Sequence, residues 1–469
     1  MDLVRCKWIR NSLKSPWFPL SVQLLIFIVF VLLIIGAWGA STDDPAFAKI
    51  LRNTNLSNLI VWSFWWPGMI LTVILLGRIW CMICPLELIT SAGSHIGLKR
   101  TVPRWLRKGW IITILYGVIL VIGVHGFNIH RVPHRMALYL LLLGILAIAF
   151  GLIFERRALC SFVCPVGYVL GLYAHCAPLE WRIKDASVCR KCTEKPCMSK
   201  ATRYRWYGRA CPNGLAPPQL NHNGDCILCT QCFKACPYDN FRWSTRRWFA
   251  DVFTRIQLPL PQVAFLVVVS GFVIYEIAAE WSDGKRILLT LPNAIAGWLH
   301  LTNPPWDGIV HGVILFGVFP VLIWLLPAVL DYFMSGKHHS VTHYFMRYGV
   351  YYIPIVASTH AIKALQKIFS RLSYIPGAIT HPRGMAWAHA IYTGALRPPV
   401  NVAGRLDWLL TPLMFALLCV GIIVAFTALR YSLQCESDDE HHRPIAPVIG
   451  LSLYALIIVI ILIGWRLFG

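Results

Sequence analysis

The hydrophobic pattern along the chain consists of long apolar runs separated by shorter polar segments. Runs long enough to cross about 30 Å of hydrocarbon as helices lie at 17–38, 57–77, 110–126, 137–154, 258–278, 308–330, 407–430 and 447–468. A weaker run covers 347–362. The pattern predicts a multi-span α-helical membrane protein, and we favour nine spans over eight.

One long polar interval, from about 155 to 256, interrupts these runs. It divides the chain into an expected N-terminal membrane domain of four spans (1–156), an extramembrane domain (157–256) and a C-terminal membrane domain of four or five spans (257–469). The composition agrees with this division, because 57% of the residues are hydrophobic and only 14% are charged, whereas soluble domains carry about 25% charged residues.

The net charge of +22 raises the question of nucleic-acid binding, and its distribution argues against it. Basic residues gather before the first run, between the second and third runs, and from Arg156 onward, whereas loops 39–56 and 127–136 hold two each. This alternation follows the positive-inside rule. It places the N-terminus and the polar interval in the cytoplasm and gives a nucleic-acid partner no support.

The densest chemical motif is the stretch CILCTQCFKACP, which holds Cys226, Cys229, Cys232 and Cys236. Three cysteines spaced C-x2-C-x2-C and followed by C-P match the bacterial ferredoxin run that holds a [4Fe–4S] cluster. A structural zinc site is the alternative, but zinc patterns usually show two separated pairs. In the ferredoxin pattern the fourth cysteine ligates a different cluster, so a second set of cysteines is required.

That second set lies upstream, in CRKCTEKPC and a later C-P. In two-cluster ferredoxins, the last cysteine of each run ligates the cluster held by the other run, so the ligand sets are crossed. One cluster takes Cys189, Cys192, Cys197 and Cys236, and the other takes Cys226, Cys229, Cys232 and Cys211. The spacers after Cys192 and Cys197 are longer than in the ferredoxin run. The expected extramembrane domain is therefore a two-cluster ferredoxin of the α+β class, working as an electron relay.

Two further cysteine pairs end the second and fourth apolar runs on the same expected face of the membrane: Cys81 and Cys84, and Cys160 and Cys164. Four thiols suffice for a third [4Fe–4S] cluster or another thiophilic metal. The alternative is two independent pairs, reduced or cycling as dithiol and disulfide. Most of the sixteen cysteines thus lie in metal-binding contexts, which favours a reducing compartment.

Titratable residues in the C-terminal third are weaker candidates. His311 and His360 sit at span ends, where they could bind a quinone or ligate a b-type haem. A haem is not favoured, because a lone pair lacks the repeats of a cytochrome b. Glu276 and Asp331 are expected to reach toward the interface. His338, His339, His343, His441 and His442 could bind a transition metal, but we interpret them as solvated loop residues.

The membrane-edge motifs GRIWCMICPLE and ERRALCSFVCPVG, followed by the two-cluster pattern, resemble the NapH family and the membrane half of NosR. The resemblance covers about residues 57–245. It implies a bacterial inner-membrane polyferredoxin that passes electrons between the quinone pool or a cytoplasmic donor and a partner redox protein. The chain departs from the family in its first motif, C-x2-C-P where C-x3-C-P is usual, and in its extension 257–469.

Two other functions stay open. Polyferredoxins of the oxidase-assembly type reduce metal for a maturing respiratory enzyme, and a redox sensor or transporter would use the C-terminal spans. No nucleophile triad, phosphate-binding glycine loop or nicotinamide fingerprint appears in the sequence. Whether the chain is an enzyme is left open; the chemistry expected of it is electron transfer at clusters or quinol oxidation.

Overall fold

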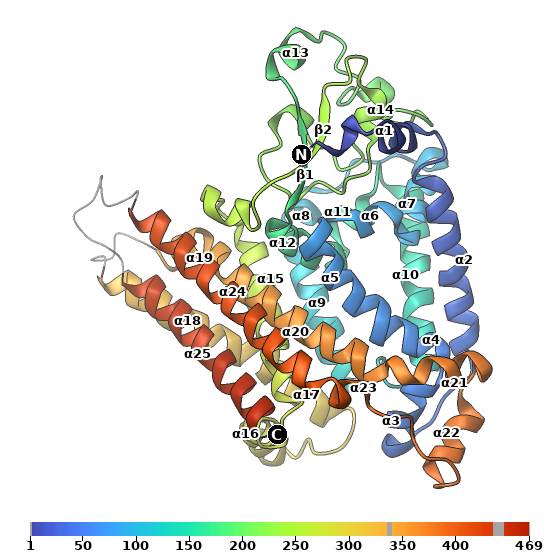
Figure 1. Cartoon of the computed structure of the whole chain (residues 1–469), viewed down its shortest axis with the longest axis vertical. Helices are drawn as coiled ribbons and strands as arrows, with labels where there is room; N and C mark the ends of the chain where they lie inside the picture. Colours follow the sequence, from blue (N-terminus) through green and yellow to red (C-terminus); the bar gives the residue numbers. More distant parts are fainter. Residues whose placement is uncertain (1, 335–339, 435–444, 469) are drawn as a thin grey trace. The chain divides into compact units, whose positions relative to one another are not determined.

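The computed structural model describes residues 2–334, 340–434 and 445–468 and is mostly helical (Figure 1). Within these ranges, seven helical stretches are long and apolar enough to cross a membrane: Leu20–Ala37, Leu56–Leu76, Pro133–Ile153, Leu260–Ala278, Trp306–Met334, Asp407–Gln434 and Ala446–Leu467. A shorter apolar helix covers Trp110–Gly126. The eight predicted apolar runs therefore all form helices, and the prediction of a multi-span helical membrane protein is confirmed.

Helix α2 (Leu20–Ala37) shows why these helices belong in lipid. Its side chains are hydrophobic on every face, and large ones such as Leu25, Ile28 and Ile35 are exposed. A helix that is apolar all round needs an apolar environment on all sides, and an exposed band of this kind is typical of a membrane-facing surface.

The weaker predicted run at 347–362 is not one of the seven candidate spans. The segment forms a 3-10 turn, η9 (Gly349–Tyr352), followed by helix α20 (Ile353–Arg371). The helix continues nine residues past the predicted end and carries Lys363, Lys367 and Arg371 in this extension. These charges lower its hydropathy, and the expectation of a ninth span over 347–362 is not supported.

The chain divides into two compact units by its contacts. Unit 1 comprises 1–32, 71–111 and 140–251, and unit 2 comprises 33–70, 112–139 and 252–469. Several long helices contribute to both units, among them α5 (Trp66–Leu76) and α10 (Pro133–Ile153). The three-part division along the sequence stays a prediction.

Unit 1 contains the cysteine-rich segment, built around a two-stranded antiparallel sheet. Strand β1 (Leu179–Ile183) pairs with β2 (Phe241–Thr245), with Trp181 opposite Trp243. Trp181 lies on the buried face and forms a small core with Phe233 and Phe241. Short helices α13 (Ala186–Lys191) and α14 (Gln231–Ala235) complete the segment. A two-cluster ferredoxin fold as such is not established by this sheet.

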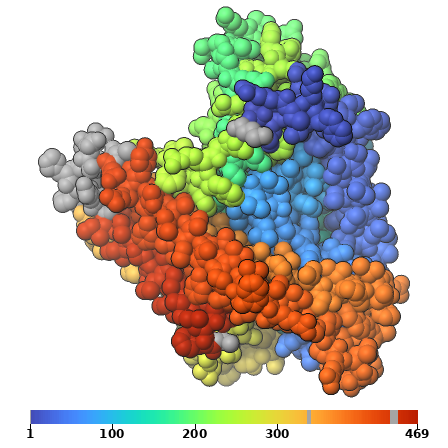
Figure 2. Space-filling model, viewed as in Figure 1, coloured from blue at the N-terminus to red at the C-terminus, as the bar shows by residue number. Residues whose placement is uncertain are grey.

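The N-terminal segment folds onto the cysteine-rich segment in unit 1. Helix α1 (Lys7–Lys14) places Arg10 and Lys14 in ion pairs with Asp239. The Lys234 ammonium donates a hydrogen bond to the Ser15 carbonyl at 2.8 Å, and Val4 and Leu13 join the core around Trp181. Figure 2 shows this dark blue segment lying on the green surface. The N-terminus is thus held by charge pairs and by apolar packing.

The rest of unit 1 is helical. Its further elements are α6 (Ile79–Ile83), α7 (Pro85–Ile96), α8 (Arg104–Arg107), α11 (Ala158–Phe162) and α12 (Pro165–Tyr173).

Unit 2 is a helical assembly in which α20 packs on α24 (Asp407–Gln434), and α18 (Phe319–Met334) packs on α25 (Ala446–Leu467). Helix α15 (Leu260–Ala278) contacts α20, α18 and α25. Its other helices are α3 (Pro45–Thr54), α4 (Leu56–Leu59), α9 (Trp110–Val118), α16 (Ser282–Trp298), α17 (Trp306–Val313), α19 (Val341–Tyr348), α21 (Ile375–Thr380), α22 (Met385–Tyr392) and α23 (Val402–Arg405).

Three stretches of unit 2 are π-helical: η2 (Ile60–Trp65), η3 (Ile119–Gly126) and η8 (Ile314–Val318). Such wide turns are rare and occur mostly at functional positions in helices. The sequence gives no simple signal for them.

Candidate functional site

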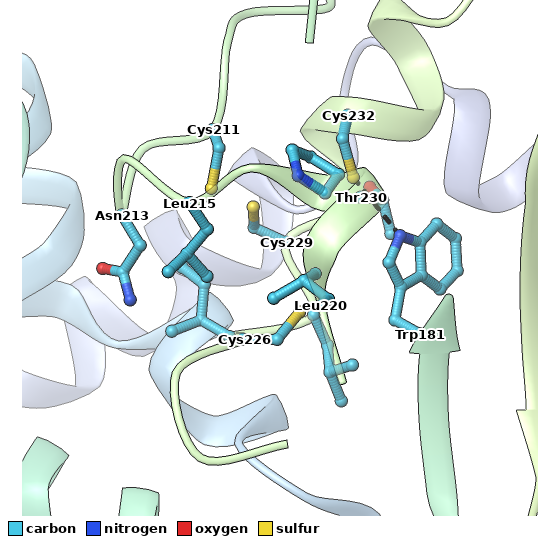
Figure 3. Close-up of a pocket in the computed structure, with 12 residues that line it drawn as sticks. Trp181, Cys211, Asn213, Leu215, Leu220, Cys226, Cys229, Thr230 and Cys232 are labelled. Atoms are coloured by element: carbon cyan, nitrogen blue, oxygen red, sulfur yellow. Dashed lines mark hydrogen bonds between the residues drawn. The ribbon is translucent and has the colours of Figure 1, made fainter. Parts of the chain in front are cut away.

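The first group of cysteines lines a pocket that we call the Cys226 pocket, formed by Cys211, Cys226, Cys229 and Cys232 (Figure 3). The pocket encloses about 360 Å³ of space, part of it open to solvent, and its other walls are largely apolar. The Trp181 indole N–H lies 3.2 Å from Cys232 Sγ and donates to it. The sheet core thus fixes one wall of the pocket and one of its sulfur atoms.

Backbone turns in the 226–232 loop direct successive thiols toward this pocket. Leu228 and Thr230 have φ angles of +57° and +59°. This left-handed region is uncommon for residues with a Cβ, and for a β-branched threonine it is a genuine outlier. Such strain persists where the surroundings over-determine it and is concentrated at functional sites. The two-residue spacers therefore act as turns that bring Cys226, Cys229 and Cys232 together.

The second group, Cys189, Cys192, Cys197 and Cys236, lines the Cys189 pocket. It encloses about 380 Å³, again partly open, with prolines and Phe241 among its walls. The Asn240 amide lies 3.3 Å from Cys189 Sγ and donates to it, and the same amide group donates to the Asp185 carbonyl. The side chain of Asn240 thereby anchors helix α13, which carries Cys189, beside the start of β2.

These two groups of four are the same as those of the crossed ferredoxin arrangement. Cys211 lies with the three cysteines that follow it, and Cys236 lies with the three upstream. That each pocket holds a cluster stays a prediction. The exchange of the two C-P cysteines is, however, a feature of the structure itself.

Within the described residues, no group of three or more His, Cys, Asp or Glu side chains is close enough to hold a metal ion. The cysteines of each group line a common pocket. The cluster and zinc interpretations both stay predictions.

Burial makes these thiols difficult to ionise on their own. It raises the pKa of Cys226 to about 11, and together with the nearby Cys211 it raises the pKa of Cys229 to about 12. Burial, followed by repulsion from Cys236, raises the pKa of Cys197 to about 11. Only thiolates bind metal, so a cationic metal centre is what would stabilise the ionised form in these pockets.

The membrane-edge cysteines lie on two similar pairs of consecutive helices in unit 1. Cys81 is on α6 and Cys84 is the N-cap of α7, whereas Cys160 is on α11 and Cys164 is the N-cap of α12. In both elements the proline after the second cysteine occupies the first turn of the next helix, where its fixed φ fits and no N–H is lost.

All four of these thiols lie near one another. Burial raises the pKa of Cys84 well above its usual value, and repulsion from Cys160, Cys164 and Cys81 adds to this increase. Burial, followed by Cys160, raises the pKa of Cys164 to about 12. The Arg78 guanidinium lies 3.7 Å from Cys81 Sγ. The structure therefore brings the four cysteines into one neighbourhood with a cation beside it, and the described cysteines are free thiols.

Comparisons with protein-family models, with curated proteins and with solved structures found no match to this chain. The resemblance to NapH and NosR therefore rests on the motifs alone.

The two histidines proposed for a haem or quinone lie in unit 2 with different neighbours. His360, on α20, is 3% exposed and lies between the rings of Trp66 and Phe272. His311, on α17, has a buried Nε2 without a hydrogen-bond partner. Neither position establishes a ligand. The histidines at 338, 339, 441 and 442 lie outside the described residues.

Sequence reasoning missed a third imidazole, His125, at the end of η3. It packs against Tyr275 and Phe316. Helix α17 passes close to it, since a Cβ at Gly308 would lie 2.2 Å from the His125 carbonyl oxygen. A glycine one turn before His311 was the only signal available in the sequence.

Sequence reasoning also missed a group of paired charges centred on the buried Lys363. The Lys363 ammonium is 2.6 Å from Glu280 Oε1 and 3.5 Å from Glu276 Oε2, and it donates to the Glu276 backbone carbonyl at 2.7 Å. The basic residues after the run 347–362 were expected in a loop, but α20 continues through Lys363 and packs on α15, where Lys363 pairs with Glu276 and Glu280. The position of Glu276 at the membrane interface stays a prediction. Asp331, expected at the interface as well, is buried.

Proposed function

We propose that this protein is a membrane-bound iron–sulfur electron-transfer protein. In this proposal it relays electrons between the quinone pool or a cytoplasmic donor and a partner redox protein in the bacterial inner membrane. The observation that carries the proposal is the crossed grouping of eight cysteines around two separate pockets. A crossed ligand set is what a two-cluster ferredoxin requires, and it joins cysteines that lie far apart in the chain.

Cys226, Cys229, Cys232 and Cys211 would hold one [4Fe–4S] cluster, and Cys189, Cys192, Cys197 and Cys236 would hold the other. Bound clusters would supply reversible one-electron redox chemistry. The protein's part is to exclude water with apolar walls and to donate hydrogen bonds to sulfur. Trp181 makes such a contact in the Cys226 pocket and Asn240 in the Cys189 pocket. Hydrogen bonds to the sulfurs are among the factors that set cluster potentials.

The four membrane-edge thiols would form a third redox or metal centre. Their mutual proximity and the neighbouring Arg78 support this part of the proposal. A guanidinium beside thiolates offsets the negative charge of a cluster, which favours its reduced form. These cysteines follow apolar helices directly, so in this proposal they would lie at the depth at which a quinol headgroup exchanges electrons.

The test is to count iron and acid-labile sulfide in protein purified without oxygen and to record EPR spectra after reduction. We expect about eight iron atoms for two clusters, or about twelve if the membrane-edge thiols hold a third. Replacing Cys84 and Cys164 by Ser should remove only the third signal. Protein that contains stoichiometric zinc and no iron would contradict the whole proposal.

A further inference from the structure

A second kind of pocket in unit 1 is lined by arginines. Arg156, Arg157, Arg203 and Arg209 surround about 270 Å³ of space, together with residues of helix α7 and with Tyr204. We call it the arginine pocket. Its walls come from three separate stretches of sequence, namely α7, the turn after α10, and the segment 203–212. The cluster proposal makes no use of it.

Many hydrogen-bond donors in this pocket have no acceptor. Arg157 is 3% exposed, and its Nε and Nη1 atoms lack a partner. The Nε atoms of Arg156, Arg203 and Arg209 are buried and unpartnered as well, and so is the hydroxyl of Tyr204. Buried polar groups are satisfied in the great majority of cases. A convergent set of unsatisfied donors therefore indicates a missing acceptor.

The charge balance points the same way. Glu155 forms an ion pair with Arg203, and Glu87 lies 3.4 Å from Arg209. Among the described residues, no carboxylate lies within ion-pair distance of Arg156 or Arg157. Burial, and next the neighbouring Arg203, lower the pKa of Arg156. Water could accept hydrogen bonds here, but it would leave the buried Arg157 and the half-buried Arg156 without an ion-pair partner in direct contact. Burying a charge without such a partner is costly.

Arg157 has neighbours that could partly explain it, because Cys160, Glu87 and Cys81 lie close enough to favour its charged form. The membrane-edge thiols are not among the neighbours of Arg156, which are Arg203, Glu155, Cys211 and Tyr204. The pocket therefore needs an acceptor of its own, whatever the membrane-edge thiols bind.

The surface beside the pocket is apolar. The Leu98 amide donates to the Leu152 carbonyl at 2.7 Å, so the end of α7 lies against the end of α10. Ile96, Leu98, Leu152 and Ile153 are all exposed there. Helix α10 is a candidate span, and basic pockets at the ends of spans bind phospholipid headgroups.

From these observations we infer that the arginine pocket binds a phosphate-class oxyanion, with Arg156 and Arg157 as its principal ligands. Guanidinium groups match phosphate oxygens in bidentate pairs, and Tyr204 supplies a further neutral donor. The apolar rim favours the phosphate of an anionic phospholipid over a free phosphate. The inference goes beyond the proposed electron transfer and does not depend on it.

The experiment uses purified, cluster-loaded full-length protein that has been delipidated in detergent. Binding of phosphatidylglycerol in mixed micelles is measured by native mass spectrometry and by the rise in unfolding temperature, and binding of inorganic phosphate is measured in parallel. We expect Arg156→Gln to weaken binding about tenfold or more, because a hydrogen bond to a charged group is lost. Arg156→Lys keeps the charge and should give an intermediate loss.

Two further variants make the result decisive. Tyr204→Phe removes one donor and no charge, so it tests the pocket even if Arg156→Gln misfolds, and a loss of about fivefold is expected. Arg205→Gln is the matched control, since Arg205 is exposed, lies between pocket residues in sequence and does not line the pocket.

Phosphatidylglycerol binding without phosphate binding would identify a lipid source, and binding of both would identify a free oxyanion site. The inference is overturned if neither binds, if only a quinone analogue binds, or if both pocket variants bind like wild type.

Discussion

The two units bury polar groups in different ways. In unit 1, neutral thiols of the Cys226 and Cys189 pockets are grouped by tight loops, and their burial raises the pKa of several of them. In unit 2, the charges around Lys363 are already paired with Glu276 and Glu280 by packing of α20 on α15. We propose that the thiols of the first arrangement ionise only when they bind a metal centre. The second is complete within the protein.

The comparison shows how to separate binding sites from structural polar clusters in this chain. An ion pair in which both charged partners belong to the protein is a structural contact and predicts nothing about ligands. Thiols that line one pocket, and guanidinium groups without acceptors, are the places where we propose bound groups. Removing one member should therefore have different consequences in the two units, namely loss of a bound group in unit 1 and loss of stability in unit 2.

The largest effect is expected in unit 1, where pairs of Cys→Ser substitutions test the crossed grouping. Cys211→Ser combined with Cys229→Ser should lose about four iron atoms, because both thiols serve one cluster. Cys211→Ser combined with Cys192→Ser should lose about eight. Iron analysis and EPR of the reduced protein measure the difference. Cys6→Ser, at an exposed thiol of the same unit, should keep all of the iron.

An equal iron loss in the two double variants would contradict the crossed arrangement. It would also remove the distinction between the two pockets on which the comparison rests.

In unit 2, Lys363→Ala should lower the free energy of unfolding by about 1–3 kcal/mol, because it leaves the partly exposed carboxylates of Glu276 and Glu280 without their shared partner. Thermal unfolding in detergent measures the loss. Lys285→Ala, at an exposed lysine of the same unit, should change stability by less than about 0.5 kcal/mol. Iron content should be unchanged in both variants. Iron loss in Lys363→Ala without a loss of stability would mean that the paired charges around Lys363 support the metal sites.

A pH-dependent contribution to stability is expected from Asp251 in unit 1. Burial by itself raises the pKa of Asp251, but hydrogen bonds from His175 and Arg246 outweigh it and hold the pKa below its usual range. The folded-state pKa lies below the unfolded value of about 3.9. The stabilisation is therefore present above about pH 4 and is lost as the pH falls through the folded-state pKa.

Asp251→Asn should accordingly lower the unfolding temperature by a constant amount between about pH 5 and 8, and by less below about pH 4. Asp43→Asn, at a fully exposed carboxylate, is the control and should have little effect. A stability difference that is the same at pH 3 and pH 7 would show that hydrogen bonding of the neutral carboxyl, and not its charge, stabilises this region.

Local patterns predicted the parts of the molecule that depend on neighbouring residues. Apolar runs gave the helices, and two-residue spacers gave the turns that bring Cys226, Cys229 and Cys232 together. The assignment of Cys211 to the Cys226 pocket and of Cys236 to the Cys189 pocket followed from the crossed ligand pattern of ferredoxins. It could not be obtained from spacing alone. The helices and the turns have in common a geometry that is set within a few residues.

The features that the sequence did not predict join segments far apart in the chain. Arg10 and Lys14 were counted only as charges that orient the membrane, yet they bind Asp239. Arg156 and Arg203 were likewise counted as cytoplasmic charge, and their shared pocket depends on packing between three segments. Lys363 was placed in a loop because the helix was expected to end at residue 362. Pairing between charges that are far apart in the sequence depends on tertiary packing, which the periodicity of a local sequence does not predict.

The smallest expected effect concerns the hydrogen bond from Trp181 Nε1 to Cys232 Sγ, 3.2 Å long. A donor to sulfur favours the reduced, more negative cluster, so Trp181→Phe should lower the reduction potential of the cluster in the Cys226 pocket. A net contribution of about 1 kcal/mol for one hydrogen bond corresponds to about 40 mV for one electron. Redox titration followed by EPR measures the change.

The sheet provides a matched control for this change. Trp243 lies directly opposite Trp181 in the register, and its Nε1 atom has no hydrogen-bond partner. Trp243→Phe therefore removes an indole of the same size from the same sheet without removing a bond to sulfur, and it should leave the potential unchanged. If both variants shift the potential equally, packing of the sheet controls it. If only Trp181→Phe does, the single N–H contact tunes the cluster, and unit 1 adjusts its bound group in a way that the paired charges of unit 2 do not.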